Sequence, residues 1–233
     1  MDKVAPGRPV ALFFWVSAVG LLCGGCTFRS RLMDPVAPQP LRPPPAGDAQ
    51  VVFIRPTSSG AGVVSIIDLN GPSGVEWRGD AGGGTWFAIR MQPGTHKLSA
   101  WFWVFTGGTQ TFCGGSCYSQ GGMIANVAAG HTYYVLIEGG FGPTAKLRAI
   151  RPDSPERGSL AEWLAEIPRY DSIVQTRGQS EFYRALMRDT EDDPPHREEQ
   201  LSKLIGEWEK HFAGYPNDQR LDQTLNVADA IDP

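Results

Sequence analysis

Residues 86–105 read Trp-Phe-Ala-Ile-Arg-Met-Gln-Pro-Gly-Thr-His-Lys-Leu-Ser-Ala-Trp-Phe-Trp-Val-Phe. Two apolar runs flank Gln92-Pro93-Gly94, where proline presets one turn dihedral and glycine accepts the positive φ of the next. We therefore expect two strands, 85–91 and 95–105, folded back on one another as a hairpin. Because such a hairpin cannot bury its own faces, further strands must lie above and beside it.

Alternating polar and apolar residues continue on both sides of this stretch. Asn70-Gly71 is a strong turn signal between two of the expected strands. Further strands are expected at 51–55, 62–69, 75–78, 123–127, 131–138 and 146–150. Short strands separated by turn residues are typical of all-β domains. The sequence therefore predicts a mainly β fold, an antiparallel β-sandwich of about seven or eight strands, over residues 49–152.

Several turn and core elements of this region occur together in a recognisable order. They are Arg55-Pro56, Asp68-Leu69-Asn70-Gly71, Gln92-Pro93-Gly94-Thr95-His96 and Ala129-Gly130-His131-Thr132-Tyr133-Tyr134-Val135. Their order resembles that of the DUF2846 type of bacterial envelope lipoprotein domain, and the Asn-Gly and Pro-Gly-x-His elements also resemble those of PEGA-like β-sandwich modules. The resemblance covers under half of the chain and includes no catalytic residue. It implies a domain of unassigned function at the cell envelope.

The first residues are predicted to be a lipoprotein signal peptide spanning 1–25. Basic residues precede an apolar run, 10–22, which is too short to span a bilayer. Gly24-Gly25-Cys26 then resembles a lipobox, although Cys23 stands where that pattern prefers Leu. The resemblance implies a lipid on Cys26 and, because Thr27 is not Asp, an outer-membrane lipoprotein facing the periplasm. A secretory signal cut nearby or an uncleaved anchor are the alternatives.

A proline-rich segment separates Cys26 from the first expected strand. Prolines stand at positions 35, 38, 40, 43, 44 and 45. This composition favours extended polyproline conformation and cannot build a core. We expect residues 26–48 to be a semi-rigid tether that lifts the domain roughly 40 Å from the membrane. A ligand for an aromatic groove is the alternative role.

After Pro152 the pattern becomes helical, which predicts a helical extension over 153–215. One helix is expected from Ser159, an N-cap residue, to Ile167 before Pro168. Others are expected at 179–188 and 196–212, the latter with an apolar stripe. This stripe could dock on the sandwich, pair with the preceding helix or contact another protein. Residues 216–233 are polar and acidic, and we expect them to be disordered.

Tryptophans are the main candidates for a binding surface. Strand 101–105 alternates so that Trp101 and Trp103 share one face with Phe105, while the other face is also apolar. Either the strand is buried on both faces, or the indoles form an exposed platform for a partner or a glycan. The candidate binding surface comprises Trp77, Trp86, Trp101 and Trp103.

Two cysteines and two histidines carry the remaining candidate chemistry. Cys113 and Cys117, separated by Gly-Gly-Ser, are predicted to form a structural disulfide in an exported protein. A redox site or a metal site are the alternatives, but the spacing exceeds that of Cys-x-x-Cys and no second cysteine pair follows. His96 and His131 are expected to make hydrogen bonds at strand starts, and a metal shared by both is the alternative.

Composition and motifs argue against several classes of function. The chain has a formal net charge of -4 and no basic stripe, so no nucleic-acid partner is expected. It has no Gly-x-Ser-x-Gly elbow, and Gly82-Gly83-Gly84 lacks the lysine and helix of a P-loop. We assign no catalytic residue, metal or cofactor. The expected function is a non-enzymatic, membrane-anchored envelope lipoprotein that binds a protein partner or helps assembly.

Two other functions stay open at this point. The tryptophans could bind glycan or peptidoglycan. A hydrolase site could also be assembled only in three dimensions, from a histidine beside a carboxylate in a concave pocket.

Overall fold

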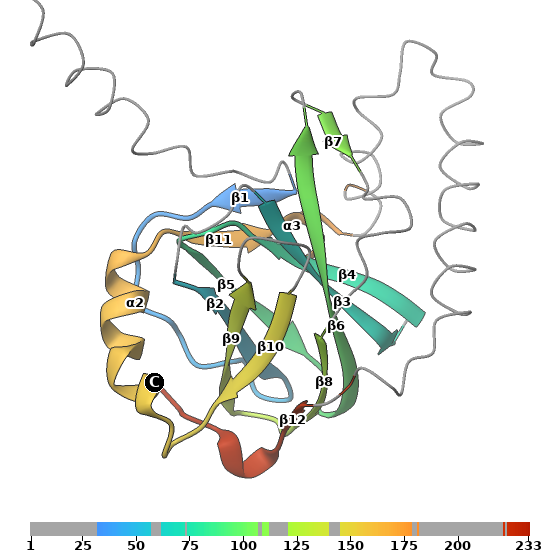
Figure 1. Ribbon diagram of the computed structural model, residues 1–233. Helices are drawn as coiled ribbons and strands as arrows, with labels where there is room; N and C mark the ends of the chain where they lie inside the picture. Colours follow the sequence, from blue (N-terminus) through green and yellow to red (C-terminus); the bar gives the residue numbers. More distant parts are fainter. Residues whose placement is uncertain are drawn as a thin grey trace, which may run out of the picture.

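Strands make up most of the regular structure in the part of the chain that is described (Figure 1). The computed structural model describes residues 32–56, 62–72, 74–106, 109–111, 121–139, 145–178, 181, 221 and 223–233. Within those ranges, no helix combines the length and the apolar character needed to cross a membrane.

The first sheet has six strands in the order β1-β11-β5-β2-β9-β10. Their bounds are β1 (Met33–Pro35), β2 (Ala49–Arg55), β5 (Thr85–Met91), β9 (Thr132–Gly139), β10 (Ala145–Ile150) and β11 (Arg169–Ser172). β11 pairs with β5 in parallel, and so does β2 with β9, whereas the remaining neighbours are antiparallel. The first sheet is therefore mixed.

The second sheet runs β12-β8-β6-β3-β4, with β7 pairing only with β6. Its strands are β3 (Gly62–Gly71), β4 (Gly74–Ala81), β6 (Gly94–Thr106), β7 (Thr109–Thr111), β8 (Gly121–Val127) and β12 (Gln223–Leu225). β12 pairs with β8 in parallel and the other pairs are antiparallel. The mainly β fold is confirmed, but the expected purely antiparallel pairing is wrong, and there are more strands than the seven or eight expected.

One hydrophobic core fills the space between the two sheets. In β2, alternation turns Val51 and Phe53 toward the second sheet, where they meet residues such as Ile66 and Leu98. Phe53 also stacks on Phe87 of β5 with ring centroids 5.1 Å apart. The two sheets therefore pack face to face and stabilise one another.

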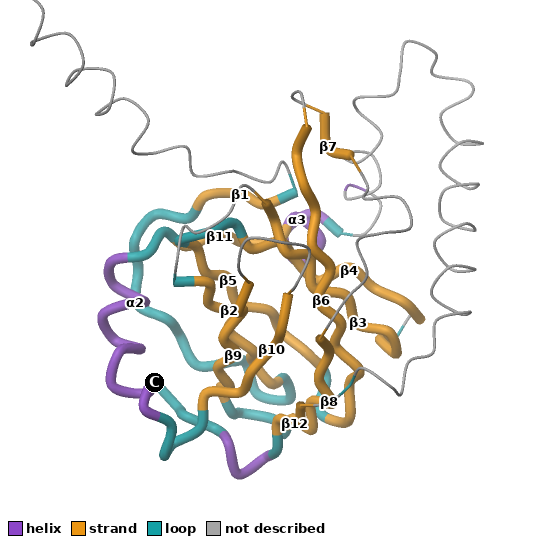
Figure 2. The backbone as a smooth tube through the Cα atoms, viewed as in Figure 1, coloured by secondary structure: helices purple, strands orange, loops and turns teal. Residues whose placement is uncertain are grey.

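The opposite face of the first sheet, here called its outer face, has an apolar cluster of its own. Val52 and Ile54 lie there with Trp86, and Leu160 covers them. Leu160 opens the helix α2 (Leu160–Glu166), which follows the 3-10 helix η1 (Pro155–Ser159). The loop between β1 and β2 runs over the same face and adds Leu41 to this cluster (Figure 2).

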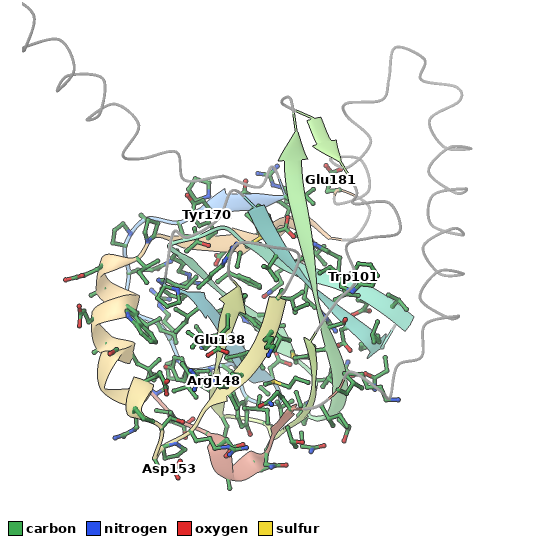
Figure 3. The ribbon with its side chains drawn as sticks, in the orientation of Figure 1. Trp101, Glu138, Arg148, Asp153, Tyr170 and Glu181 are labelled. Carbon is green, nitrogen blue, oxygen red and sulfur yellow. The ribbon has the colours of Figure 1, made fainter. Side chains whose placement is uncertain are left out.

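An ion-pair network attaches η1 to the edge of the first sheet. Arg148 of β10 donates through Nε to Glu138 of β9 at 2.7 Å and through Nη2 to Glu156 of η1 at 2.8 Å (Figure 3). These contacts position the segment that leads into α2.

The turn at Gln92-Pro93-Gly94 does not close a hairpin. β5 pairs with β2 and β11 in the first sheet, whereas β6 pairs with β3 and β8 in the second. Gly94 has φ 141°, which places the backbone in a region that favours glycine. The predicted hairpin is therefore wrong, because the turn carries the chain from one sheet to the other.

The segment predicted as a tether belongs to the folded domain from residue 32 onward. Leu32 and Met33 are only 3% and 2% exposed and join the core between the sheets. Met33–Pro35 forms β1 against β11. The expectation of a free tether over 26–48 is wrong for these residues, because two apolar side chains before the first proline anchor the segment in the core.

The C-terminal part of the chain is also built into the sheets. β11 follows α2, and the short helix α3 (Ile173–Arg177) continues from it. Near the end, β12 and the 3-10 helix η2 (Val227–Asp229) follow one another, and Leu225 is fully buried. The prediction of disorder is wrong for residue 221 and residues 223–233. The helix expected at 159–167 is present as η1 and α2, whereas 196–212 lies outside the described residues.

Candidate functional site

A groove of about 460 Å³ lies on the outer face of the first sheet. One wall is the loop between β1 and β2, which contributes Leu41 and Arg42. The other wall comes from β11 and α3, while Gln50 of β2 and Arg90 of β5 line it from the sheet. The groove is thus built from segments far apart in the sequence.

Hydrogen bonds between side chains and backbone hold the walls of this groove in place. The amide of Gln175 on α3 donates to the Ala88 carbonyl at 3.1 Å, and its oxygen accepts from the Arg90 backbone N–H at 3.2 Å. On the other wall, the side chain of Gln50 donates to the Arg42 carbonyl at 3.2 Å. The backbone positions of Arg42 and Arg90 are therefore set by the fold.

The groove carries an excess of positive charge. Arg169 donates through Nε and Nη2 to Oδ1 of Asp171 at 3.2 and 3.1 Å, and its guanidinium lies 5.2 Å from the ring centre of Trp86. Arg42 and Arg90 are exposed, and neither forms an ion pair with another described residue. Three arginines against one aspartate give the lining a net charge of 3 - 1 = +2.

A second cluster of charged groups is buried where β3, β4 and β6 meet. Asp68 accepts from Arg78 and contacts His96 Nδ1, each at 2.8 Å, and its side chain is fully buried. Arg78 also contacts Glu76 at 2.6 Å. The other ring nitrogen of His96 contacts the carbonyl of Gln92 at 2.8 Å, which confirms the hydrogen bond expected at this strand start.

The pKa values of Asp68 and His96 shift in opposite directions. Burial alone would raise the pKa of Asp68, but the hydrogen bonds and charges of His96 and Arg78 outweigh it and bring it below its ordinary value. Burial alone would lower the pKa of His96, but its bonds to Asp68 and Gln92 outweigh burial and raise it. Both ring nitrogens of His96 are thus engaged, one by Asp68 of β3 and the other by Gln92 in the turn before β6.

His131 lies just before β9 and contacts the C-terminal segment of the chain. Its Nδ1 is 3.0 Å from Oδ2 of Asp232, and both side chains are about half exposed. The Thr132 backbone N–H donates to the same carboxylate at 2.9 Å and is the main reason that the pKa of Asp232 is lowered. This contact attaches the C-terminal segment to β9.

His96 and His131 each lie beside a carboxylate, but neither residue lines the groove. A hydrolase site of the kind considered from the sequence is therefore not assembled there. Within the part of the chain that the structure describes, no three His, Cys, Asp or Glu residues gather closely enough to hold a metal ion.

Three of the four candidate tryptophans belong to the core. Trp77 and Trp86 are 2% exposed and Trp101 is 4% exposed. The indole of Trp77 donates to Asp80 and that of Trp86 to the Ile167 carbonyl, each at 2.9 Å. An exposed platform made by these indoles is wrong, because all three side chains are almost completely buried. Trp103 lies in β6, but its side chain is not among those that the structure describes.

The remaining predicted site residues are three cysteines. Cys26, Cys113 and Cys117 all lie outside the described residues. Their predicted lipidation and disulfide stay predictions.

The groove was not anticipated from the sequence. Its arginines stand at positions 42, 90 and 169 and form no local motif. One usable signal is present in β5, where Trp86 and Ala88 are followed by Arg90 at the same parity. An arginine that follows apolar residues on the outer face of a strand indicates where other elements stop covering that face.

The chain was also compared with known proteins. It matches no protein-family model, no curated protein and no solved structure.

Proposed function

We propose that this chain is a non-enzymatic lipoprotein of the bacterial envelope, anchored through Cys26 to the outer membrane and facing the periplasm. Its β-domain serves as a binding module that assembles with a protein partner. We assign the domain to the β-sandwiches, of the DUF2846 type that its turn motifs resemble. Two mixed sheets that share one core support this assignment.

The observation that carries the proposal is the short distance in sequence between Cys26 and the first sheet. Met33 is buried at the start of β1, and β1 pairs with β11. Met33 is the seventh residue after Cys26, and a chain of that length spans at most roughly 25 Å when fully extended. An acyl group on Cys26 would therefore hold the domain close to the membrane surface.

The side chains of the groove are better suited to binding a ligand than to catalysing a reaction. The groove offers guanidinium groups and side-chain amides on a fixed framework, which are recognition groups. The histidines of the β-domain, by contrast, hold strands and the C-terminal segment in place. General acid or base chemistry needs such a group within hydrogen-bond reach of a bound substrate.

Mass spectrometry of the mature N-terminus tests the anchor. The full chain is expressed in a bacterium with an outer membrane, as wild type, as Cys26→Ala and as the matched control Cys23→Ala. We expect wild type and Cys23→Ala to begin at an acylated Cys26 and to fractionate with the outer membrane. Cys26→Ala should lose the acyl mass. An unacylated mature N-terminus in the wild type would overturn the proposal.

Cross-linking in intact cells tests the assembly role. A short amine-reactive cross-linker should give one discrete heavier species that contains the acylated chain. The same species should be absent for Cys26→Ala and present for Cys23→Ala, because only the former leaves the membrane surface. A pattern that is identical in both variants would contradict a role that depends on the anchor.

A further inference from the structure

We propose that the groove on the outer face of the first sheet binds the phosphate groups of membrane phospholipids and so orients the domain on the membrane. The phosphate chemistry follows from the groove itself. The choice of a membrane source rests on the anchor of the proposed function.

The charges of the groove select an oxyanion. Arg42, Arg90 and Arg169 reach it from three separate segments, and Asp171 is the one carboxylate of the lining. Asp171 is already engaged by Arg169 through a single oxygen. The planar guanidinium presents paired donors that match phosphate oxygens, so converging arginines favour phosphate over a neutral ligand.

The size and stiffness of the groove suit a headgroup. About 460 Å³ lies within the usual range for small-molecule sites. The carbonyl of Arg42 is held by Gln50, the backbone N–H of Arg90 by Gln175, and Arg169 by Trp86 and Asp171. Because these positions are set before binding, little ordering is needed when a ligand arrives.

The position of the groove favours a lipid over a soluble phosphate. β11, which supplies Arg169 and Asp171, pairs directly with β1, and Asp34 lies opposite Asp171. β1 is the strand nearest in sequence to Cys26. An acylated Cys26 would therefore keep this wall of the groove within roughly 30 Å of the headgroup layer.

Vesicle co-sedimentation with an unacylated protein tests the proposal without the anchor. The mature chain from residue 26 is made with Cys26→Ser, and binding is measured to vesicles of phosphatidylcholine alone and with phosphatidylglycerol. Variants are Arg42→Gln, Arg90→Gln and both together. Arg157→Gln is the matched control, because Arg157 is an exposed arginine of η1 that does not line the groove.

We expect binding to the anionic vesicles that weakens about fivefold for each groove arginine removed. The control should lose less than twofold, and all variants should unfold at the same urea concentration as wild type. An equal loss for Arg157→Gln would overturn the groove as the site, since general surface charge would then explain binding.

A second arm separates the two sources of phosphate. Glycerol 1-phosphate is titrated into the same protein without vesicles and followed by isothermal calorimetry. Binding of glycerol 1-phosphate together with a failure to bind vesicles would overturn the membrane source. Vesicle binding that depends on Arg42 and Arg90 would support phospholipid binding by the groove even if Cys26 proved to carry no lipid. The groove proposal and the anchor proposal can therefore be refuted independently.

Discussion

Replacing Asp68 by Asn tests the buried ion network that joins β3, β4 and β6. The Asp68 carboxylate lies 2.8 Å from both Arg78 and His96 and is fully buried. Removing one partner of a buried ion pair costs about 3–5 kcal/mol. Arg78 keeps Glu76 at 2.6 Å, which offsets part of the loss. We therefore expect Asp68→Asn to lower the free energy of unfolding by about 3 kcal/mol at mildly acidic pH.

The pH dependence of this loss follows from the two pKa shifts. The pKa of Asp68 is lowered from 3.8, so its contribution is present above pH 3.8 and is lost as the pH falls through the folded value. The pKa of His96 is raised from 6.5, so its contribution is complete below pH 6.5 and is lost as the pH rises through the folded value. The difference between wild type and variant should be largest between these two limits.

Urea unfolding followed by tryptophan fluorescence at three pH values, about 3, 5.5 and 8.5, measures this difference. Asp153→Asn is the matched control, because Asp153 lies exposed in the loop before η1 (Figure 3). We expect the control to change the free energy of unfolding by less than about 0.5 kcal/mol. A loss for Asp68→Asn that is the same at all three pH values would refute the coupling to His96.

Two further substitutions test the segments that enter the sheets unexpectedly. Met33→Ala should lower the free energy of unfolding by about 2–4 kcal/mol in urea titrations, because its side chain is 2% exposed in the core. A residue in a free tether would show no change. Leu225→Ala in β12 should lower the free energy of unfolding by about 3 kcal/mol for the same reason. A negligible change would contradict the burial of Leu225 in the sheet. Val227→Ala, at a side chain that is 49% exposed, is the control for both and should change little.

The longer strands could be predicted because their pattern is local. β5 occupies 85–91, as expected from its alternating residues, and β3, β6 and β9 lie within two residues of their predicted bounds. Their residues also contain the β-branched and aromatic types that fit a pleated surface. Periodicity identifies a strand of this length without knowledge of its neighbours.

Strand pairing could not be predicted in the same way. The Pro93-Gly94 turn signals a reversal, but the partners of β5 and β6 are chosen by residues far away in the chain. β2 takes one edge of β5 and β11 the other, so β6 finds its partners in the second sheet. A turn motif carries no information about this competition for edges.

The short strands were missed because three or four residues show no period. β1 lies beside a proline-rich run, β11 follows a helix, and β12 lies in an acidic segment. In each case the composition of the surroundings concealed a buried side chain such as Met33 or Leu225. The groove was missed for a related reason, because its arginines come from the β1–β2 loop, from β5 and from β11, which only the fold brings together.

The placement of β11 and β12 constrains the order in which the protein can acquire its structure. Met33 pairs with Ser172, and Met123 with Gln223, so a strand of each sheet pairs with a partner that is made 139 or 100 residues later. Contacts of such long range form slowly. During synthesis the first sheet stays incomplete until β11 has emerged, and the second sheet stays incomplete until β12 has emerged. Until then β5 and β8 each have an edge without its partner, and such unpaired edges can pair with strands of other chains.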